Sequence, residues 1–531
     1  MDYSLGLTLA ALLSLAACSG SSSGSASPGG ADTSFQSVVV YSADDGSGKV
    51  QAWRAPLENL ELENLMASMP MAEVIPGGLS LAPNGEVAMV TTEDAGQIQV
   101  HSFNVRSGAH SELLLQGQTV AQDPPTFHWN PLTSLGGYML QQTVDTQGDP
   151  LRAPQDLYLV RTNQAALQRL NQNELEMRFE GWNTLGTLFS ARSADLISGQ
   201  RNLSIYNDQG EPVANPLVGL SYSEGEVQWT PGYMGFLLEV THFGVTRTEL
   251  YQYAPGMGNA LLSPSNSQVG SFLYSTDGSL LAMELDAAAT GKRMVVLSQD
   301  NPTFLQSLLS QQAPLAETVL HGWSSNQDLL ALSYVREGGT EGEILITSSS
   351  GANQFRLVDN ALPGSKIYDA AWSPDGQSLA FTSDHEELGR KNLYVYRSGE
   401  PVNHTPWLVP GMSGSIADVV WSSDSNAIFC SFEPDGAAFK SVAFFSNSPL
   451  HQGRLLGDRM LNMAQQATPG NPMTSLQPSM DSKGVVWVQQ DSATGLRGVV
   501  YTDALDSARD RVLSSDDGTL HLERIFQFFV R

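Results

Sequence analysis

The chain contains few residues of the kinds that bind nucleic acid or form disulfides. Lys and Arg number 27 among 531 residues, against 55 Asp and Glu, so the net charge is −28. A surface of this charge repels phosphate backbones, and nucleic acid is not expected as a partner. Of the two cysteines, Cys430 falls in a strand pattern and is expected to be a small buried apolar residue.

Long apolar runs are also missing. The run from Leu7 to Ala17 is too short to span a bilayer and has the length of the apolar region of a signal peptide. It ends in Leu-Ala-Ala-Cys at 15–18, which resembles the lipobox of bacterial lipoproteins, and this resemblance implies that Cys18 carries the lipid. With Cys18 lipidated, Cys430 would be the only thiol, which excludes an intramolecular disulfide. The first residues carry Asp2 and no Lys or Arg, whereas a positively charged start is expected, so either the start codon is misassigned or the signal is atypical. The alternative to a lipoprotein is an ordinary secretory signal with a chance cysteine.

Residues 19–34 are rich in Ser and Gly and almost free of apolar side chains, which predicts a flexible tether. We therefore expect a lipoprotein signal peptide at 1–17, a lipidated Cys18 with its tether at 18–34, and a folded domain at 35–531. Such a protein would be exported and attached to a bacterial membrane by its N-terminal lipid alone. Ser at position 19, by resemblance to a known sorting rule, points to the outer membrane.

Catalytic spacings are absent from the sequence. It has no Gly-x-Ser-x-Gly nucleophile elbow, no P-loop and no His-Glu-x-x-His. Asp384, His385, Glu386 and Glu387 are consecutive, so they cannot all converge on one cation, and their loop is expected to be solvated. The segment DDGSG at 44–48 is expected to be a turn. We assign no catalytic residue, no metal ligand and no cofactor.

One short segment recurs along the chain, and it is clearest in AWSPDGQSLAFTSD at 371–384. Pro374 presets φ, Asp375 can bond nearby backbone and Gly376 permits positive φ, so a tight turn is predicted after Trp372. Apolar and polar residues then alternate over 378–383, which predicts a strand. The segment is therefore predicted to be a β-hairpin.

Copies of this hairpin have a regular spacing. They begin at Tyr274, Trp323, Trp372 and Trp421, which lie 49 residues apart (323 − 274, 372 − 323, 421 − 372). Looser copies begin at Leu81, Trp129, Trp182, Trp229 and Pro478. The turn residues recur with the aromatic residue, as Asp277, Gly278 and Asp424. A residue that recurs in step with the fold is expected to form the turn and not to catalyse a reaction.

Each repeat continues with a third strand, such as NLYVYR at 392–397, and a fourth, such as PWLVP at 406–410. Four short antiparallel strands in about 50 residues is typical of one blade of a β-propeller. Residues 37–54 look like a second and third strand, and 521–531 look like a first strand. We therefore expect an all-β propeller of eight to ten blades, as one ring or two tandem rings, in which the termini share one blade.

The Trp-Ser-Pro-Asp-Gly-x-x-Leu-Ala-Phe-x-Ser-Asp segment at 372–384 resembles the repeat of TolB-like β-propellers, also called the WD40-like beta propeller repeat. The resemblance covers nearly all of the chain after the tether. It implies a scaffold at the cell envelope, outer membrane or periplasm, that binds a protein or glycan partner and is not an enzyme. A structural lipoprotein without a dedicated ligand is a second possibility.

A third possibility is a metal-dependent polysaccharide lyase or hydrolase. Oligogalacturonate lyases are similar in their repeat, and that resemblance implies a metal held by histidines near the ring axis. His128 and His321 both precede a repeat aromatic, so they occupy similar places in two blades. Converging histidines and carboxylates at the centre of the ring would favour the enzyme.

Overall fold

The computed structural model describes residues 38–530 with gaps at 45, 58–61, 95–96, 114–125, 133–136, 144–154, 162–163, 172–174, 196, 218–225, 243, 265–267, 288–290, 299–304, 308–314, 337, 351–352, 359–360, 437–439, 448–452, 462–475, 480–482, 491–493, 495, 505–509, 515–521 and 523. Within these residues the named elements are all β-strands, and none forms a helix long and apolar enough to cross a bilayer. The predicted signal peptide, Cys18 and tether lie outside the described residues.

The strands follow one another as short antiparallel meanders, which we number as blades 1 to 10. Blades 1 to 5 are β39 (Arg524–Val530), β1 (Val38–Asp44), β2 (Val50–Pro56) and β3 (Glu63–Asn64); β4 (Glu73–Leu81), β5 (Val87–Asp94), β6 (Gln97–Asn104) and β7 (His110–Leu113); β8 (Thr126–Trp129), β9 (Gly137–Thr143), β10 (Gln155–Arg161) and β11 (Gln164–Arg169); β12 (Leu175–Trp182), β13 (Leu188–Asp195), β14 (Arg201–Asn207) and β15 (Pro212–Ala214); and β16 (Val227–Trp229), β17 (Met234–His242), β18 (Val245–Ala254) and β19 (Gly258–Leu261).

Blades 6 to 10 continue the same plan. They are β20 (Gln268–Tyr274), β21 (Leu280–Ala287), β22 (Gly291–Ser298) and β23 (Leu305–Ser307); β24 (Leu315–Trp323), β25 (Leu329–Arg336), β26 (Gly342–Ser348) and β27 (Gln354–Arg356); β28 (Ile367–Trp372), β29 (Ser378–Ser383) and β30 (Asn392–Arg397); β31 (Gly414–Trp421), β32 (Ala427–Pro434), β33 (Lys440–Ser446) and β34 (Gly453–Leu461); and β35 (Leu476–Pro478), β36 (Gly484–Gln490), β37 (Arg497–Asp503) and β38 (Arg511–Val512).

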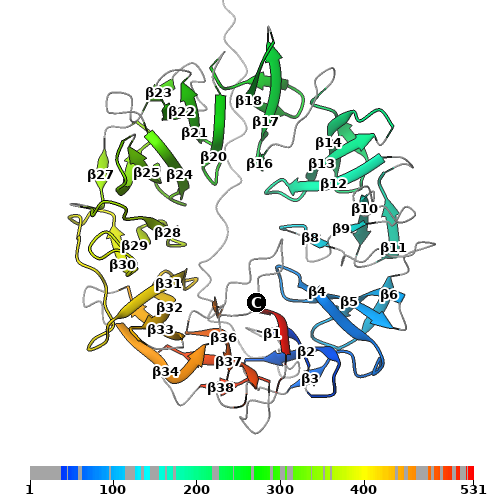
Figure 1. The fold of residues 1–531 in the computed structure, drawn as a ribbon. Coiled ribbons are helices and arrows are strands. Elements are labelled where there is room, and N and C mark those ends of the chain that lie inside the picture. Colours follow the sequence, from blue (N-terminus) through cyan, green and yellow to red (C-terminus); the bar gives the residue numbers. More distant parts are fainter. Residues whose placement is uncertain are drawn as a thin grey trace, which may run out of the picture. The chain divides into compact units, whose positions relative to one another are not determined.

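These strands form eight hydrogen-bonded sheets, and two of the sheets contain eight strands each. Each eight-stranded sheet is two meanders joined by a single residue pair, Lys292 with Leu315 in one and Leu461 with Gln489 in the other. Six single blades and two joined pairs make ten. The described strands therefore complete one ring, in which the first strand of each blade lies nearest the centre (Figure 1).

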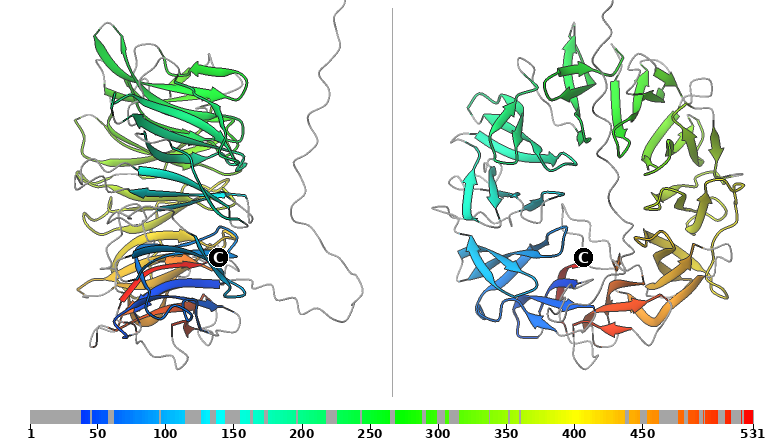
Figure 2. Two further views of the ribbon diagram at one scale, coloured as in Figure 1. Left: turned by 90° about the vertical axis from the view of Figure 1, so that its right-hand side faces the viewer. Right: turned by 180° about the vertical axis from the view of Figure 1, so that it is seen from behind.

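The hydrophobic core is divided among the gaps between neighbouring blades. The described residues form ten apolar clusters, and each joins side chains of two adjacent blades around the ring. A four-stranded sheet alone would expose both faces, and stacking on both sides removes them from water. Figure 2 shows the same ring from its edge and from behind. The prediction of an all-β propeller is confirmed.

The ring is closed by strands from the two ends of the chain. Strand β39 pairs with β1 in antiparallel register, with Val530 opposite Val39 and Phe528 opposite Tyr41. Strands β2 and β3 complete this sheet, so blade 1 has one strand from the C-terminal end and three from the N-terminal end. The predicted shared blade is confirmed, and the pairing covers strand edges that would otherwise be open.

The recurring tryptophans join each blade to the preceding one. In blades 7, 8 and 9 the indole N–H donates to the backbone carbonyl just before the previous blade's aromatic: Trp323 to Leu273 O, Trp372 to Gly322 O and Trp421 to Ala371 O, each at 3.0 Å. The ring of each tryptophan also packs in an inter-blade cluster. One side chain thus supplies both apolar contact and a directional bond between neighbouring sheets.

The fourth strand predicted at 406–410 is not formed. Only one isolated bridge, between Leu393 and Trp407, continues the described part of blade 8 beyond β30. Pro406 and Pro410 flank this segment, and proline cannot donate to a strand ladder. Residues 398–413 are therefore a loop, although Trp407 and Val409 are buried against blade 9.

Candidate functional site

The recurring aspartates lie inside their own hairpin turns. The Asp375 carboxylate accepts hydrogen bonds from the Ser373 hydroxyl at 2.5 Å and the Gln377 N–H at 3.0 Å. Asp277 and Asp424 have the same two kinds of partner. The bond from Ser275 is the largest influence on the pKa of Asp277 and lowers it. These carboxylates fix turn geometry and are spread over three blades, so they do not form a common site.

His128 and His321 are in separate blades and have separate partners. The His128 ring stacks on Phe179 of blade 4 with centroids 4.6 Å apart, and burial lowers its pKa to about 4. His321 Nε2 lies 2.8 Å from Ser333 Oγ, and burial lowers its pKa to about 4 as well. Among the described residues, no group of three or more His, Cys, Asp or Glu side chains is placed to hold a metal ion.

Cys430 is fully buried between blades 8 and 9, which confirms the expectation of an apolar role. Burial raises the pKa of its thiol, and the negative charge of Asp418 adds to the effect. A thiol held protonated in this way is a poor nucleophile.

The loop after β29 is not the fully solvated segment that its sequence suggests. Asp384 and His385 are each only 3% exposed. The Asp384 carboxylate accepts from the Lys366 N–H at 2.7 Å, the Tyr368 hydroxyl at 2.8 Å and the Gly389 N–H at 2.9 Å. Burial alone would raise the pKa of Asp384, but these bonds lower it. These three bonds therefore hold the loop against blade 8, so the segment is not a solvated hairpin.

This folded loop is one wall of a groove between blades 8 and 9, with a volume of about 260 Å³. The floor is apolar and comes from the next blade, with Ile416 of β31 and Phe432 of β32 each 2% exposed. The opposite wall is the loop that replaces the fourth strand. Its Leu408 and Met412 line the groove and are 54% and 45% exposed.

Charged side chains form the remaining rim. Glu386 and Glu387 line the groove from the folded loop, as does Arg390. Arg390 is paired with Glu387 at 2.6 Å and also with Asp435 of blade 9, so it ties the two blades together across the groove. With Arg390 engaged by two acids, the lining has an acidic excess beside its apolar floor.

A buried tyrosine packs on the other face of blade 8. Tyr394 of β30 is fully buried in the cluster between blades 7 and 8, whereas the groove lies between blades 8 and 9. Burial raises the pKa of Tyr394, and the charge of Glu386, a groove residue, raises it further. The His385 ring packs against Tyr394 with centroids 4.7 Å apart.

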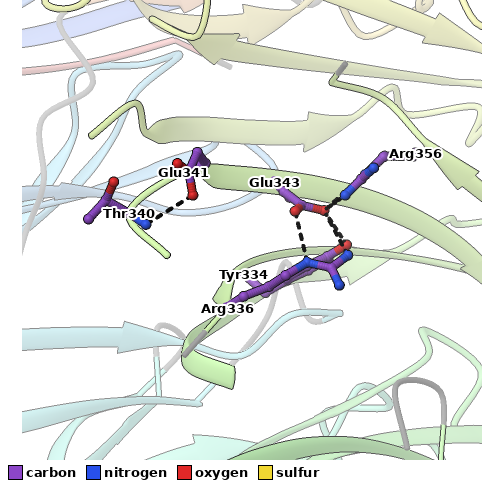
Figure 3. A network of polar contacts seen from close by, with 6 residues as sticks. All are labelled: Tyr334, Arg336, Thr340, Glu341, Glu343 and Arg356. Atoms are coloured by element: carbon purple, nitrogen blue, oxygen red, sulfur yellow. Dashed lines mark hydrogen bonds and ion pairs between the residues drawn. The ribbon is translucent and has the colours of Figure 1, made fainter. Parts of the chain in front are cut away.

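The most extensive described carboxylate network is on blade 7 and is fully occupied by its own partners (Figure 3). Glu343 of β26 accepts from the Tyr334 hydroxyl at 2.6 Å, from Arg336 Nε at 3.0 Å and from Arg356 Nε at 2.9 Å. Burial would raise the pKa of Glu343, but these three partners lower it to about 2. The network joins β25, β26 and β27 and is better suited to holding a blade together than to proton transfer.

The sequence signals only part of the groove. The run of charges at 384–391 is visible, but the sequence places it in solvent. The sequence predicts that Leu408 belongs to a strand and Met412 to the turn that follows it. The floor of the groove belongs to the next repeat. The groove combines three segments of two repeats, so no single motif identifies it.

Comparisons with known proteins assign no family to this chain. A scan of protein-family models and a search of curated proteins both give no match. Similar solved structures include a prolyl endopeptidase (12% identity, 70% of this chain and 54% of that chain, TM-score 0.38), an oligogalacturonate lyase in complex with manganese (12%, 74% and 100%, TM-score 0.33) and TolB from Acinetobacter baumannii (15%, 62% and 79%, TM-score 0.27). The chain thus spans about half the length of the prolyl endopeptidase. Such values assign no activity or partner.

Proposed function

We propose that this chain is an exported propeller, anchored in the bacterial envelope by a lipid on Cys18, that binds a protein partner in the groove between blades 8 and 9. The single observation that carries the proposal is the exposure of Leu408 and Met412 beside an apolar floor. Exposed aliphatic side chains around a hollow are typical of a protein-binding surface, whereas a single exposed apolar residue is ordinary.

The charges of the groove favour a particular kind of segment. Glu386 and Glu387 lie beside apolar surface, so a partner segment with apolar side chains and a Lys or Arg would be complementary. A glycan would be expected to use aromatic platforms, and the groove's described aromatic, Phe432, is nearly covered. The acidic excess of the whole chain also helps to exclude nucleic acid and anionic headgroups.

The proposal is tested by capture of partners from native envelope on the soluble form that begins near Ala31. We expect a stoichiometric protein that is lost when Leu408→Asp and Met412→Asp are introduced together. Met257→Asp is the matched control, because Met257 is 86% exposed in the β18–β19 turn and is not among the groove residues. Capture that survives the double change would place the partner elsewhere.

Metal content measured on the same sample tests the enzyme alternative. A bound transition metal with no protein partner would overturn the scaffold proposal and direct attention to polysaccharide substrates. Membrane fractionation of cells that express a Cys18→Ser variant tests the anchor separately. Loss of the lipid is expected to release the protein from the membrane without altering groove binding.

A further inference from the structure

Three arginines of blade 4 line one small hollow. Arg178 of β12, Arg192 of β13 and Arg201 of β14 surround about 100 Å³ together with Glu176 and Ala194. The chain has about half as many basic as acidic residues, so a lining with three positive charges and one negative charge is against its general composition. This hollow is far along the chain from the groove residues, which belong to blades 8 and 9.

The strand register puts the arginines on one face. Arg178 pairs directly with Arg192, and Ala194 pairs with both Glu176 and Arg201. Leu203, two residues beyond Arg201 on β14, packs against blade 5, so this face of blade 4 is the one turned toward blade 5. The small side chain of Ala194 leaves the space between them open. Like charges directly opposite on paired strands destabilise a sheet, so the fold gains nothing from this pairing.

Two acids hold two of the arginines. Arg178 is held by Glu176 at 2.8 Å, and Arg192 is held by Glu180 at 2.6 Å. The described lining residues and Glu180 together comprise three arginines and two acids. The acids fix the directions of two guanidinium groups, which prearranges them for a ligand.

Comparison among blades shows that the charge of Arg192 is not needed for the fold. Arg192 stands ten residues after the blade's aromatic, the place taken by Ser333, Thr382 and Ser431 in blades 7, 8 and 9. In those blades the hydroxyl bonds the polar residue at the bulge of the innermost strand: His321, Asp369 and Asp418. Arg192 makes the equivalent bond to Glu180, so a hydroxyl in its place would retain the architecture.

We propose that this hollow is a binding site for one oxyanion group, a carboxylate or a phosphoryl group, on a small ligand. Guanidinium groups bind such anions through paired N–H donors with geometric selectivity. The volume is that of about three waters, which suits a single carboxylate or phosphoryl group and not a large ligand body. The proposal is independent of the groove and stands if groove binding fails.

The test is calorimetric titration of the whole soluble chain with inorganic phosphate and, separately, with succinate, at constant ionic strength. Arg192→Ser is expected to weaken binding at least tenfold, because it restores the residue type of blade 7 and removes one donor. Arg106→Ser is the matched control, an arginine 48% exposed on blade 2 whose only described ion pair is with Glu86 at 4.0 Å. It is expected to leave binding unchanged.

Binding of phosphate but not succinate would identify the phosphoryl source, and the reverse would identify the carboxylate. If Arg192→Ser fails to fold, Arg178→Ser serves instead, because Arg178 is 45% exposed and its loss leaves the bulge bond intact. The absence of binding by both probes, or binding that neither change weakens, would overturn the proposal.

Discussion

Blades 6 to 9, which we call the regular half, and blades 3 to 5, which we call the irregular half, make the same kind of inter-blade contact with different regularity. In blades 7 to 9 each tryptophan donates to a backbone carbonyl at 3.0 Å, and Trp182 of blade 4 does the same to His128 O at 3.3 Å. Trp129 and Trp229, by contrast, donate to the hydroxyls of Ser80 and Ser190. Backbone acceptors are available whatever the sequence, but hydroxyl acceptors depend on one residue type. Blades 3 and 5 therefore rely on particular side chains for a bond that blade 4 and the regular half obtain from the backbone.

Hairpin length differs between the halves too. Trp372 pairs with Leu379 across its turn, but Trp229 pairs with Met234 and Trp129 with Tyr138. Shorter and longer turns shift the repeat spacing while the strands that follow still pair. Turn length therefore sets the spacing of a repeat, whereas the fold depends on the strand pairing, which persists across turns of different length.

The largest expected effect comes from removing one of the tryptophans that join neighbouring blades in the regular half. Trp421→Ala should lower the free energy of unfolding by about 3–5 kcal/mol, because it deletes a large side chain that is 7% exposed. Trp421→Phe keeps most of the packing and removes the bond to Ala371 O, so about 1 kcal/mol is expected. Urea unfolding checks both values. Equal losses for the two changes would show that the bond, and not the packing, carries the contact.

The next effect concerns the carboxylate at the start of the third strand in each half. Glu343→Gln should cost about 2 kcal/mol at pH 7, because its three donors would face a neutral acceptor. The pKa of Glu343 is depressed to about 2, so its contribution is present above the unfolded value of 4.5 and is lost as pH falls from 4.5 towards 2. Wild type and variant should therefore converge in stability across that window.

Asp156 is the counterpart of Glu343 in the irregular half, where it accepts from Arg169 at 2.8 Å and Asn171 at 2.6 Å. Asp156→Asn should destabilise the chain at pH 7 by a similar amount. Urea unfolding measures both variants, and the pH is varied for Glu343→Gln. A Glu343→Gln difference that persists undiminished at pH 2 would contradict the assigned network.

A smaller effect separates backbone strain from crowding at the turns. Gly376 has φ of 68°, and a Cβ there would lie 2.5 Å from Ser324 Oγ of the neighbouring blade. Gly399 has φ of 81° and open space around the same position. Gly376→Ala should cost about 2 kcal/mol and Gly399→Ala about 1 kcal/mol, by thermal or urea unfolding. Equal costs would mean that the hairpins of adjacent blades are not in close contact.

Much of the fold could be predicted because its signals are local. Turn residues at 373–376 and alternation at 378–383 lie within one hairpin, and copies at fixed spacing imply stacking. Two details depart from the repeat pattern. Pro406 and Pro410 prevent a fourth strand in blade 8. In the turn of blade 9, Ser425 has a φ of 64° at the position that Gly376 and Gly278 occupy in other copies.

The candidate sites were less predictable, because each depends on contacts between repeats. The groove needs the folded loop at 384–391, and that folding depends on Asp384 receiving the Lys366 N–H from before β28. The arginine hollow depends on register, since Arg178 and Arg192 are 14 positions apart in sequence (192 − 178) but directly opposite across β12 and β13. Neither residue pattern is a motif when read along the chain.

Closure of the ring between β1 and β39 also has a consequence in time. Val39 pairs with Val530, a separation of 491 positions (530 − 39). At about 5–20 residues per second, synthesis of the intervening chain takes roughly 25 to 100 seconds. Throughout that interval the inward edge of β1, which pairs with β39 in the closed ring, has no native partner, and an unpaired edge is a template for pairing with other chains. The last strand to be made therefore sets how long a newly made chain depends on protection from its neighbours.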